Sequence, residues 1–232
     1  MKFKEKFVPA KFILRINRFV IRAELMSGEE IKAYCPSTGS LRSCYETGNR
    51  IFLRKNNNPK RKYRYTWILS EIKNSLVFIN TQKTNYLVEE AINEGVIKEL
   101  KNYKIIRSEV KSSQHTRLDF LLSNVSRDCY LEVKSITFVE NGFYKFPDAP
   151  TKRGKKHLKE LIKLKKIGFR TILLFVTHRD DANRFKPASD IDTEYAEILR
   201  KADNNGVEIL VYESKVSLKG IEIRKSVKDK LI

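Results

Sequence analysis

The chain has 232 residues, 41% of them hydrophobic, so it is long enough to bury the core of one large domain or two smaller ones. Lys and Arg number 47 against 28 Asp and Glu, and the resulting net charge of +19 indicates a polyanionic partner. Three cysteines without a CxxC pair exclude the common zinc spacings, and without a signal peptide or a membrane-length apolar run we expect a cytoplasmic protein.

The first third of the chain alternates short apolar segments with turn residues. Strands are predicted at 11–25, 29–35, 49–55, 63–72 and 75–80, separated by glycines and by the NNNPK segment at 56–60. Five strands with little helix predict a small β-barrel. An OB-like barrel is the barrel of this size that most often holds nucleic acid, although a generic small β-domain fits the pattern nearly as well.

The segment PKRKYRYTW at 59–67 alternates cations with aromatic rings. Cations neutralise phosphates and aromatic faces stack on unpaired bases, a combination that single-strand binders use. We therefore predict nucleic-acid contacts from Lys60, Arg61, Lys62, Arg64 and Tyr65. A hairpin with a solvated basic turn and core aromatics is equally compatible with the pattern.

After residue 80 the pattern changes to helices and strands in alternation. A helix over 84–100, with a break at Gly95, is predicted to bridge the two regions. Strands follow at 104–112, 117–123, 129–139, 170–178 and 207–214, with helices at 151–168 and 192–206. The order predicts an α/β domain with a mixed sheet. We expect residues 1–82 to form an OB-like nucleic-acid-binding domain and residues 83–232 to form the α/β domain.

Charged side chains interrupt two of the predicted strands. Asp119 lies in RLDFLLS, which is nearly all apolar, and a carboxylate there needs a compensating cation. In DCYLEVKS at 128–135, the two-residue period puts Glu132 and Lys134 on one face. A turn between these strands would bring Asp119 beside Glu132, where the two carboxylates would repel each other.

A divalent metal relieves such repulsion, and Mg²⁺ or Mn²⁺ suits a site with one or two carboxylates, because waters and phosphate oxygens fill the remaining positions. We predict catalytic roles for Asp119, Glu132 and Lys134, with Lys134 near the attacking water. The predicted metal ligands are Glu109, Asp119 and Glu132. Ion pairs are the alternative: Asp119 with Arg117 or Lys134, Glu109 with Lys111, and Glu132 with Lys134.

Asp119 followed by Glu132-x-Lys134 on the next strand resembles the core of the PD-(D/E)XK nuclease superfamily. Longer segments resemble the sugar fermentation stimulation protein family: CPSTG at 35–39, HTRLDFLL at 115–122, LEVKSITF at 131–138 and FPDAPTKRGKKHLKEL at 146–161. The resemblance implies an N-terminal OB-fold, a nuclease-like α/β domain, DNA binding and a link to genes of sugar (maltose) utilisation. This chain has YCPSTG where the family more usually has HCPNTG, so Tyr34 and Ser37 replace a His and an Asn. The replacement weakens the expectation that the side chains at these two positions recognise a ligand.

The loop at 146–154, which is part of the segment that resembles the family, suggests a phosphate contact. Thr151 is a candidate N-cap of a helix whose free N–H groups lie near two cations. We predict nucleic-acid contacts from Lys152, Arg153 and His157. The alternative is plain cap chemistry, in which Asp148 satisfies nearby amides and the cations are solvated.

Three functions follow, and the sequence leaves them open. The first is a magnesium-dependent nuclease that hydrolyses DNA, and the second is a non-catalytic DNA-binding regulator of sugar metabolism genes built on a nuclease-like scaffold. The third is a basic protein that binds anionic metabolites. DNA is the expected partner, and no membrane contact or particular oligomeric state is predicted.

Overall fold

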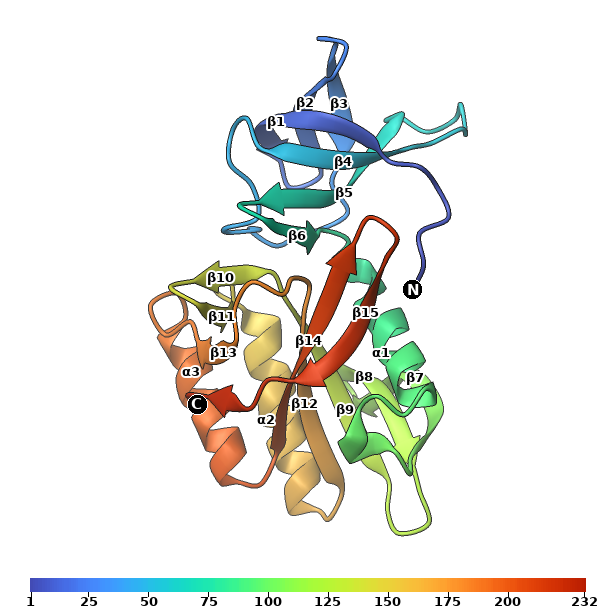
Figure 1. The fold of residues 1–232 in the computed structure, drawn as a ribbon. Helices are drawn as coiled ribbons and strands as arrows, with labels where there is room; N and C mark the ends of the chain where they lie inside the picture. Colours follow the sequence, from blue (N-terminus) through green and yellow to red (C-terminus); the bar gives the residue numbers. More distant parts are fainter.

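The computed structural model describes residues 1–232, except for the side chain of Ile106. A β-barrel lies at one end of the molecule and a larger α/β domain at the other (Figure 1). Among the described residues, no helix has both the length and the apolar character needed to cross a membrane.

Five strand pairings close the barrel in the order β1-β2-β3-β5-β4 and back to β1. The pairing of β3 with β5 is parallel, and the other four are antiparallel. Its strands are β1 (Val8–Asn17), β2 (Val20–Leu25), β3 (Glu30–Tyr34), β4 (Arg50–Lys55) and β5 (Tyr65–Ile72), and β6 (Ser75–Phe78) extends the sheet from β5. The predicted five-stranded OB-like barrel is confirmed. The predicted strand at 11–25 is two strands, because the chain turns at residues 18–19.

The barrel core takes up Trp67, one of the aromatic residues beside the basic turn, and Tyr65 packs against that core. Trp67 is fully buried, and its ring lies 5.4 Å from that of Phe12 and 5.9 Å from that of Tyr45. The ring of Trp67 is therefore part of the barrel core, as the alternative interpretation of this segment expected.

A mixed six-stranded sheet forms the centre of the second domain, as predicted. Its order is β15-β14-β12-β9-β8-β7, with β9, β12 and β14 parallel to one another. The strands are β7 (Lys104–Ser113), β8 (Thr116–Ser123), β9 (Cys129–Ile136), β12 (Arg170–Thr177), β14 (Glu208–Ser217) and β15 (Gly220–Ser226). All residues of β12 after the first are buried, which explains its continuous apolar sequence.

Helices cover both faces of this sheet. Helix α1 (Thr84–Asn93) packs on one face, with apolar residues of β9 and β12 in the same cluster. The opposite face holds α2 (Lys152–Lys166) and α3 (Thr193–Asn204). Thr151 and Asp192 cap these two helices by accepting from the N–H groups of Gly154 and Tyr195, which confirms the predicted helix starts. Helix α1 ends before Gly95, where the break was predicted, and the short 3-10 turns η1 (Thr81–Lys83) and η2 (Lys98–Leu100) flank it.

The segment at 140–150, between the predicted strand at 129–139 and the predicted helix at 151–168, contains a strand. A small second sheet has the order β10-β11-β13-β16, made of β10 (Phe138–Glu140), β11 (Phe143–Phe146), β13 (Arg184–Pro187) and β16 (Asp229–Lys230). β11 pairs with β13, about forty residues away, and local sequence carries no signal for such a pairing. The predicted strand at 129–139 is likewise divided, between the two sheets, at Thr137.

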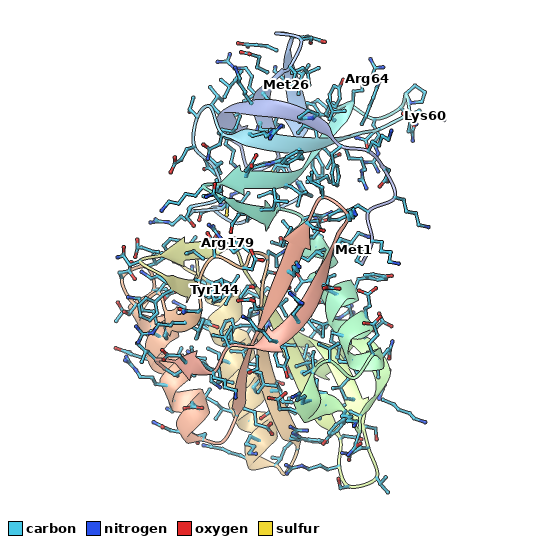
Figure 2. All side chains as sticks on the ribbon, viewed as in Figure 1. Met1, Met26, Lys60, Arg64, Tyr144 and Arg179 are labelled. Atoms are coloured by element: carbon cyan, nitrogen blue, oxygen red, sulfur yellow. The ribbon has the colours of Figure 1, made fainter. Side chains whose placement is uncertain are left out.

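Buried polar contacts join the barrel to the α/β domain. The Arg179 guanidinium, 1% exposed, donates to the carbonyl oxygens of Ser43 and Thr137 at 2.9 and 3.1 Å (Figure 2). The backbone N–H of Phe78 donates to the carbonyl oxygen of His178. The N-terminus also crosses to the second domain, because the N–H of Phe3 donates to Lys219. The two domains are therefore fixed to each other through several bonds.

Candidate functional site

The candidate site lies where β8 and β9 separate. The two strands pair only from Leu122–Cys129 to Phe120–Leu131. Beyond that pair, Oδ2 of Asp119 accepts from the backbone N–H of Val133 at 2.7 Å, in place of a ladder bond. The predicted hairpin is confirmed, and Asp119 and Glu132 lie just past the end of its paired part, where both line one cleft.

Glu132 is 2% exposed and points toward α2. Its Oε1 contacts the ammonium of Lys134 and Nδ1 of His157, so both partners share one carboxylate oxygen. The predicted pairing of Glu132 with Lys134 is present. The other oxygen, Oε2, is buried and has no hydrogen-bond partner among the described residues. A buried carboxylate oxygen without a partner is costly and marks a place where a cation would bind.

An interdomain cleft of about 380 Å³ opens onto these side chains. Its lining comes from the barrel segment 37–39, from the start of α1, from β8 and β9, and from the start of α2. Arg15 holds the barrel segment by donating to the carbonyl oxygens of Ser37 and Gly39. Asp148 ties it to the α/β domain, since its Oδ2 accepts from the N–H of Leu41 at 2.9 Å. The cleft therefore has walls from both domains.

The two carboxylates influence each other's ionisation. Burial, reinforced by the charge of Glu132, raises the pKa of Asp119 above its ordinary value. Burial alone would also raise the pKa of Glu132, but the hydrogen bond from His157 and the charge of Lys134 outweigh it and lower that pKa. The cleft thus contains an ionised Glu132 and a second carboxyl group that its charge opposes, which favours a bound cation.

The residues present fit a divalent cation with few protein ligands. Asp119 and Glu132 supply carboxylate oxygens, and Oε2 of Glu132 lacks a partner. No group of three or more His, Cys, Asp or Glu side chains suited to a metal occurs in the part of the chain that the structure describes. Mg²⁺ accepts such a site because it keeps several waters and binds through one or two carboxylates.

Glu109, the third predicted metal ligand, does not line the cleft beside Asp119 and Glu132. It lies on β7 between the pairs Ser108–Phe120 and Val110–Leu118, level with Asp119, but its side chain is exposed. Its backbone has φ +51°, a left-handed conformation that is uncommon for glutamate. Metal ligation by Glu109 stays a prediction, and its exposure argues against it.

The basic hairpin forms a second hollow next to the cleft. Lys60, Arg61, Lys62 and Arg64 are exposed and lie on the turn between β4 and β5, whose tip projects from the barrel in Figure 2. A groove of about 580 Å³, here called the hairpin groove, is lined by Tyr34, Pro36, Arg54, Arg61, Lys62, Tyr63, Thr66, Asn80, Gln82 and Lys83. Tyr65, half-buried at the start of β5, packs against the barrel core.

At the other side of the cleft, the three predicted contacts on α2 differ in exposure. Lys152 and Arg153 are exposed at the first turn of the helix. His157 is 3% exposed; its Nδ1 faces Glu132, and its Nε2 receives a hydrogen bond from Nε of Arg153 at 3.3 Å. His157 therefore contacts the carboxylate in this structure, and direct nucleic-acid contact by it stays a prediction.

Two residues of the cleft were missed by the sequence reasoning. Asn85, in the first turn of α1, donates from Nδ2 to Oδ1 of Asp119 at 2.9 Å. Lys145, on β11, lines the cleft but is paired with Glu140 and Asp190 at 2.7 and 2.8 Å. The signal for Asn85 was a polar residue at the start of a bridging helix, which is too common to identify a site.

Two family models match the chain. The model described as the SfsA N-terminal OB domain matches residues 13–79, and the model described as the sugar fermentation stimulation protein RE domain matches residues 82–220. The two matches correspond to the barrel and to most of the α/β domain.

Full-length relatives are similar over nearly the whole chain. A sugar fermentation stimulation protein homolog from Geotalea uraniireducens is 44% identical over 215 residues, covering 93% of each chain. A homolog from Shewanella sp. strain MR-4 is 41% identical over 229 residues, covering 97% of this chain and 98% of its own. The solved structure of Pyrococcus furiosus SfsA in complex with Ca²⁺ is 28% identical, has a TM-score of 0.89, and is matched over 98% of its length by all of this chain.

Proposed function

Because the chain belongs to the sugar fermentation stimulation protein family, with an OB domain and a restriction endonuclease-like domain, we propose that it is a divalent-metal-dependent nuclease that hydrolyses DNA phosphodiester bonds. The observation that carries the proposal is the convergence of Asp119 and Glu132 beside Lys134 in the cleft, with one carboxylate oxygen left without a partner. The family membership confirms the resemblance inferred from the sequence motifs.

Asp119 and Glu132 would hold Mg²⁺ or Mn²⁺. The P. furiosus relative, solved with Ca²⁺, supports a divalent cation in this family. When bound, such an ion polarises a phosphoryl oxygen and lowers the pKa of a water. Asn85 and the N–H of Val133 orient the Asp119 carboxylate, and His157 orients that of Glu132. The Lys134 ammonium, 13% exposed at the cleft, stabilises negative charge on the phosphate and positions the attacking water.

DNA is the proposed polyanion because cationic surfaces flank the cleft on both sides. The hairpin cations lie on the barrel, and Lys152 and Arg153 lie at the start of α2. Neutralising phosphates with such side chains releases counterions and supplies sequence-independent affinity. The OB and restriction endonuclease-like domains both support nucleic-acid binding.

The direct test incubates purified protein and Mg²⁺ or Mn²⁺ with plasmid or with single-stranded DNA, and cleavage of either form supports the proposal. The wild type is expected to cut, and Lys134→Ala and Asp119→Asn are expected to reduce the rate by about 10² or more, since each removes a group of the reaction. Lys163→Ala, which removes an exposed cation further along α2, is the matched control and is expected to cut at the wild-type rate. Equal cleavage by wild type and Lys134→Ala would contradict the proposal.

A second candidate function is a DNA-binding regulator that retains the scaffold without catalysis. The observation in its favour is that Lys134, His157 and Glu132 already satisfy one another around one oxygen. This version predicts DNA binding that falls steeply with salt but is unchanged by EDTA and by Asp119→Asn, together with no cleavage in any metal. Cleavage that depends on Lys134 would exclude it.

A further inference from the structure

The hairpin groove and the interdomain cleft are two parts of one trench. Gln82 lines both hollows. On one wall, Tyr34 and Pro36 of the groove are followed in the chain by Ser37, which lines the cleft. On the other wall, Lys83 of the groove is followed by Thr84, which lines the cleft. Two chain segments, 34–39 and 80–85, thus run the length of the trench from the hairpin to Asp119.

The groove end of the trench carries positive charge and aromatic faces. Arg54, Arg61, Lys62 and Lys83 line it, and no acidic side chain does so among the described residues. Tyr63 is half-buried beside them, with the ammonium of Lys62 lying 5.7 Å from its ring centre. Proteins that bind single strands combine cations, which contact phosphates, with aromatic rings, on which bases stack. A base inside a duplex has no free face for such stacking, so this surface suits a single strand.

The cleft end is recessed and its two walls are tied together. Glu132 is 2% exposed, so a phosphodiester must enter the cleft to reach it. The wall at 37–39 is fixed by Arg15 on one side and by the Leu41–Asp148 bond on the other. A duplex is a stiff cylinder with a persistence length of about 150 base pairs, whereas a single strand turns within a few nucleotides. A recessed site with fixed walls therefore favours the flexible form.

Resting on the nuclease function proposed above, we propose that the substrate is single-stranded DNA, with bases held at Tyr63 and the backbone led past Lys83 and Gln82 into the cleft at Asp119 and Glu132. The barrel then favours single-stranded over duplex DNA, in addition to raising the affinity for DNA. Intact duplex DNA binds the basic surface but does not deliver a phosphate to the buried carboxylate.

Binding and cleavage are measured on labelled single-stranded and blunt duplex DNA of the same sequence. Binding is read by fluorescence anisotropy in EDTA, so that it is separated from cleavage. Single-stranded DNA is expected to bind about tenfold more tightly or better, and Tyr63→Ala is expected to weaken it by about 5- to 150-fold while leaving duplex binding unchanged. Arg61→Gln with Lys62→Gln is expected to reduce the salt slope for the single strand by about 1.4.

Matched controls remove an aromatic ring or two positive charges at positions outside the trench. Tyr86→Ala deletes a ring that is 53% exposed on α1, and Lys163→Gln with Lys166→Gln deletes two exposed charges at the far end of α2. Neither is expected to change single-strand binding. An equal loss of single-strand binding in these controls would show that the position of the ring and of the charges does not matter, and would overturn the proposal.

The outcomes separate this proposal from the nuclease function. Equal binding and equal cleavage of both DNA forms would overturn the single-strand proposal and leave the nuclease standing. A single-strand preference that depends on Tyr63, without cleavage in Mg²⁺ or Mn²⁺, would support the trench and remove the nuclease.

Discussion

At the residue scale, the contacts of His157 explain how the cleft keeps one carboxylate ready for a cation. Nδ1 of His157 and the Lys134 ammonium both contact Oε1 of Glu132, which leaves Oε2 without a partner. Arg153 donates to Nε2 and thereby fixes the ring from the other side. Partners behind a metal ligand orient it and raise its affinity for the metal, so His157 is a positioning residue in the proposed site.

His157→Ala is expected to lower cleavage and Mg²⁺ or Mn²⁺ affinity by about 10- to 100-fold, because the Glu132 carboxylate loses the bond that orients it. His157→Asn retains a donor and is expected to recover most of the loss. Metal affinity measured by calorimetry, beside a thermal melt of each variant, checks this prediction. His115→Ala, which removes an exposed histidine, is the control. Unchanged metal affinity in His157→Ala would leave the residue a structural role only.

At the scale of elements, the segment after β12 anchors the barrel. Arg179 follows the end of β12 and reaches Ser43 on the barrel and Thr137 between β9 and β10. Its Nε and Nη2 pair with the carboxylate of Asp181 at 2.6 and 2.5 Å. One guanidinium thus joins three connecting segments, and its bonds hold the barrel in position relative to the sheet.

Arg179→Met is expected to lower the free energy of unfolding by about 3–5 kcal/mol, because it leaves Asp181 and buried acceptors without their partner. Arg184→Met is the matched control, since Arg184 pairs with Asp229 on the surface, where both side chains are about half exposed. The control is expected to cost about 1 kcal/mol or less. Denaturant unfolding measures both, and similar losses in the two variants would contradict a special role for the buried anchor.

At the scale of the whole molecule, the junction of the two domains contains a buried neutral histidine. His178 stacks on Phe78 of β6, with ring centres 5.5 Å apart, and its Nε2 lies 2.8 Å from Oγ1 of Thr84. Complete burial lowers the pKa of His178 from 6.5 to about 4. Protonation of this ring therefore opposes folding, which links the stability of the junction to pH.

Stability is expected to fall as the pH decreases from about 6.5 to about 4. Between these values the unfolded chain binds a proton at His178 that the folded chain does not, so unfolding takes up a proton and is favoured by acid. The loss attributable to this group is about 3 kcal/mol. Urea unfolding across this range, with His178→Gln and the control His115→Gln, measures it. A pH profile that keeps its slope in His178→Gln would contradict the assignment.

The sequence by itself determined the two-domain organisation and singled out Asp119, Glu132 and Lys134, three of the charged residues in the cleft. Residue periods of two and 3.6 report locally which face of a strand or helix is buried, so they identified the barrel, the mixed sheet and its helices. They also singled out Asp119 and Glu132, because carboxylates in apolar strands are conspicuous. The turn between their strands supported the prediction that the two lie together.

The tertiary structure decided which partners surround those carboxylates. Asn85 reaches Asp119 across 34 residues and His157 reaches Glu132 across 25, both through helices packed on opposite faces of the sheet. The exposed side chain of Glu109 and the pairing of β11 with β13 were likewise unreadable from the sequence. Contacts between distant segments depend on how helices and strands pack, and the local pattern of side chains does not encode that packing.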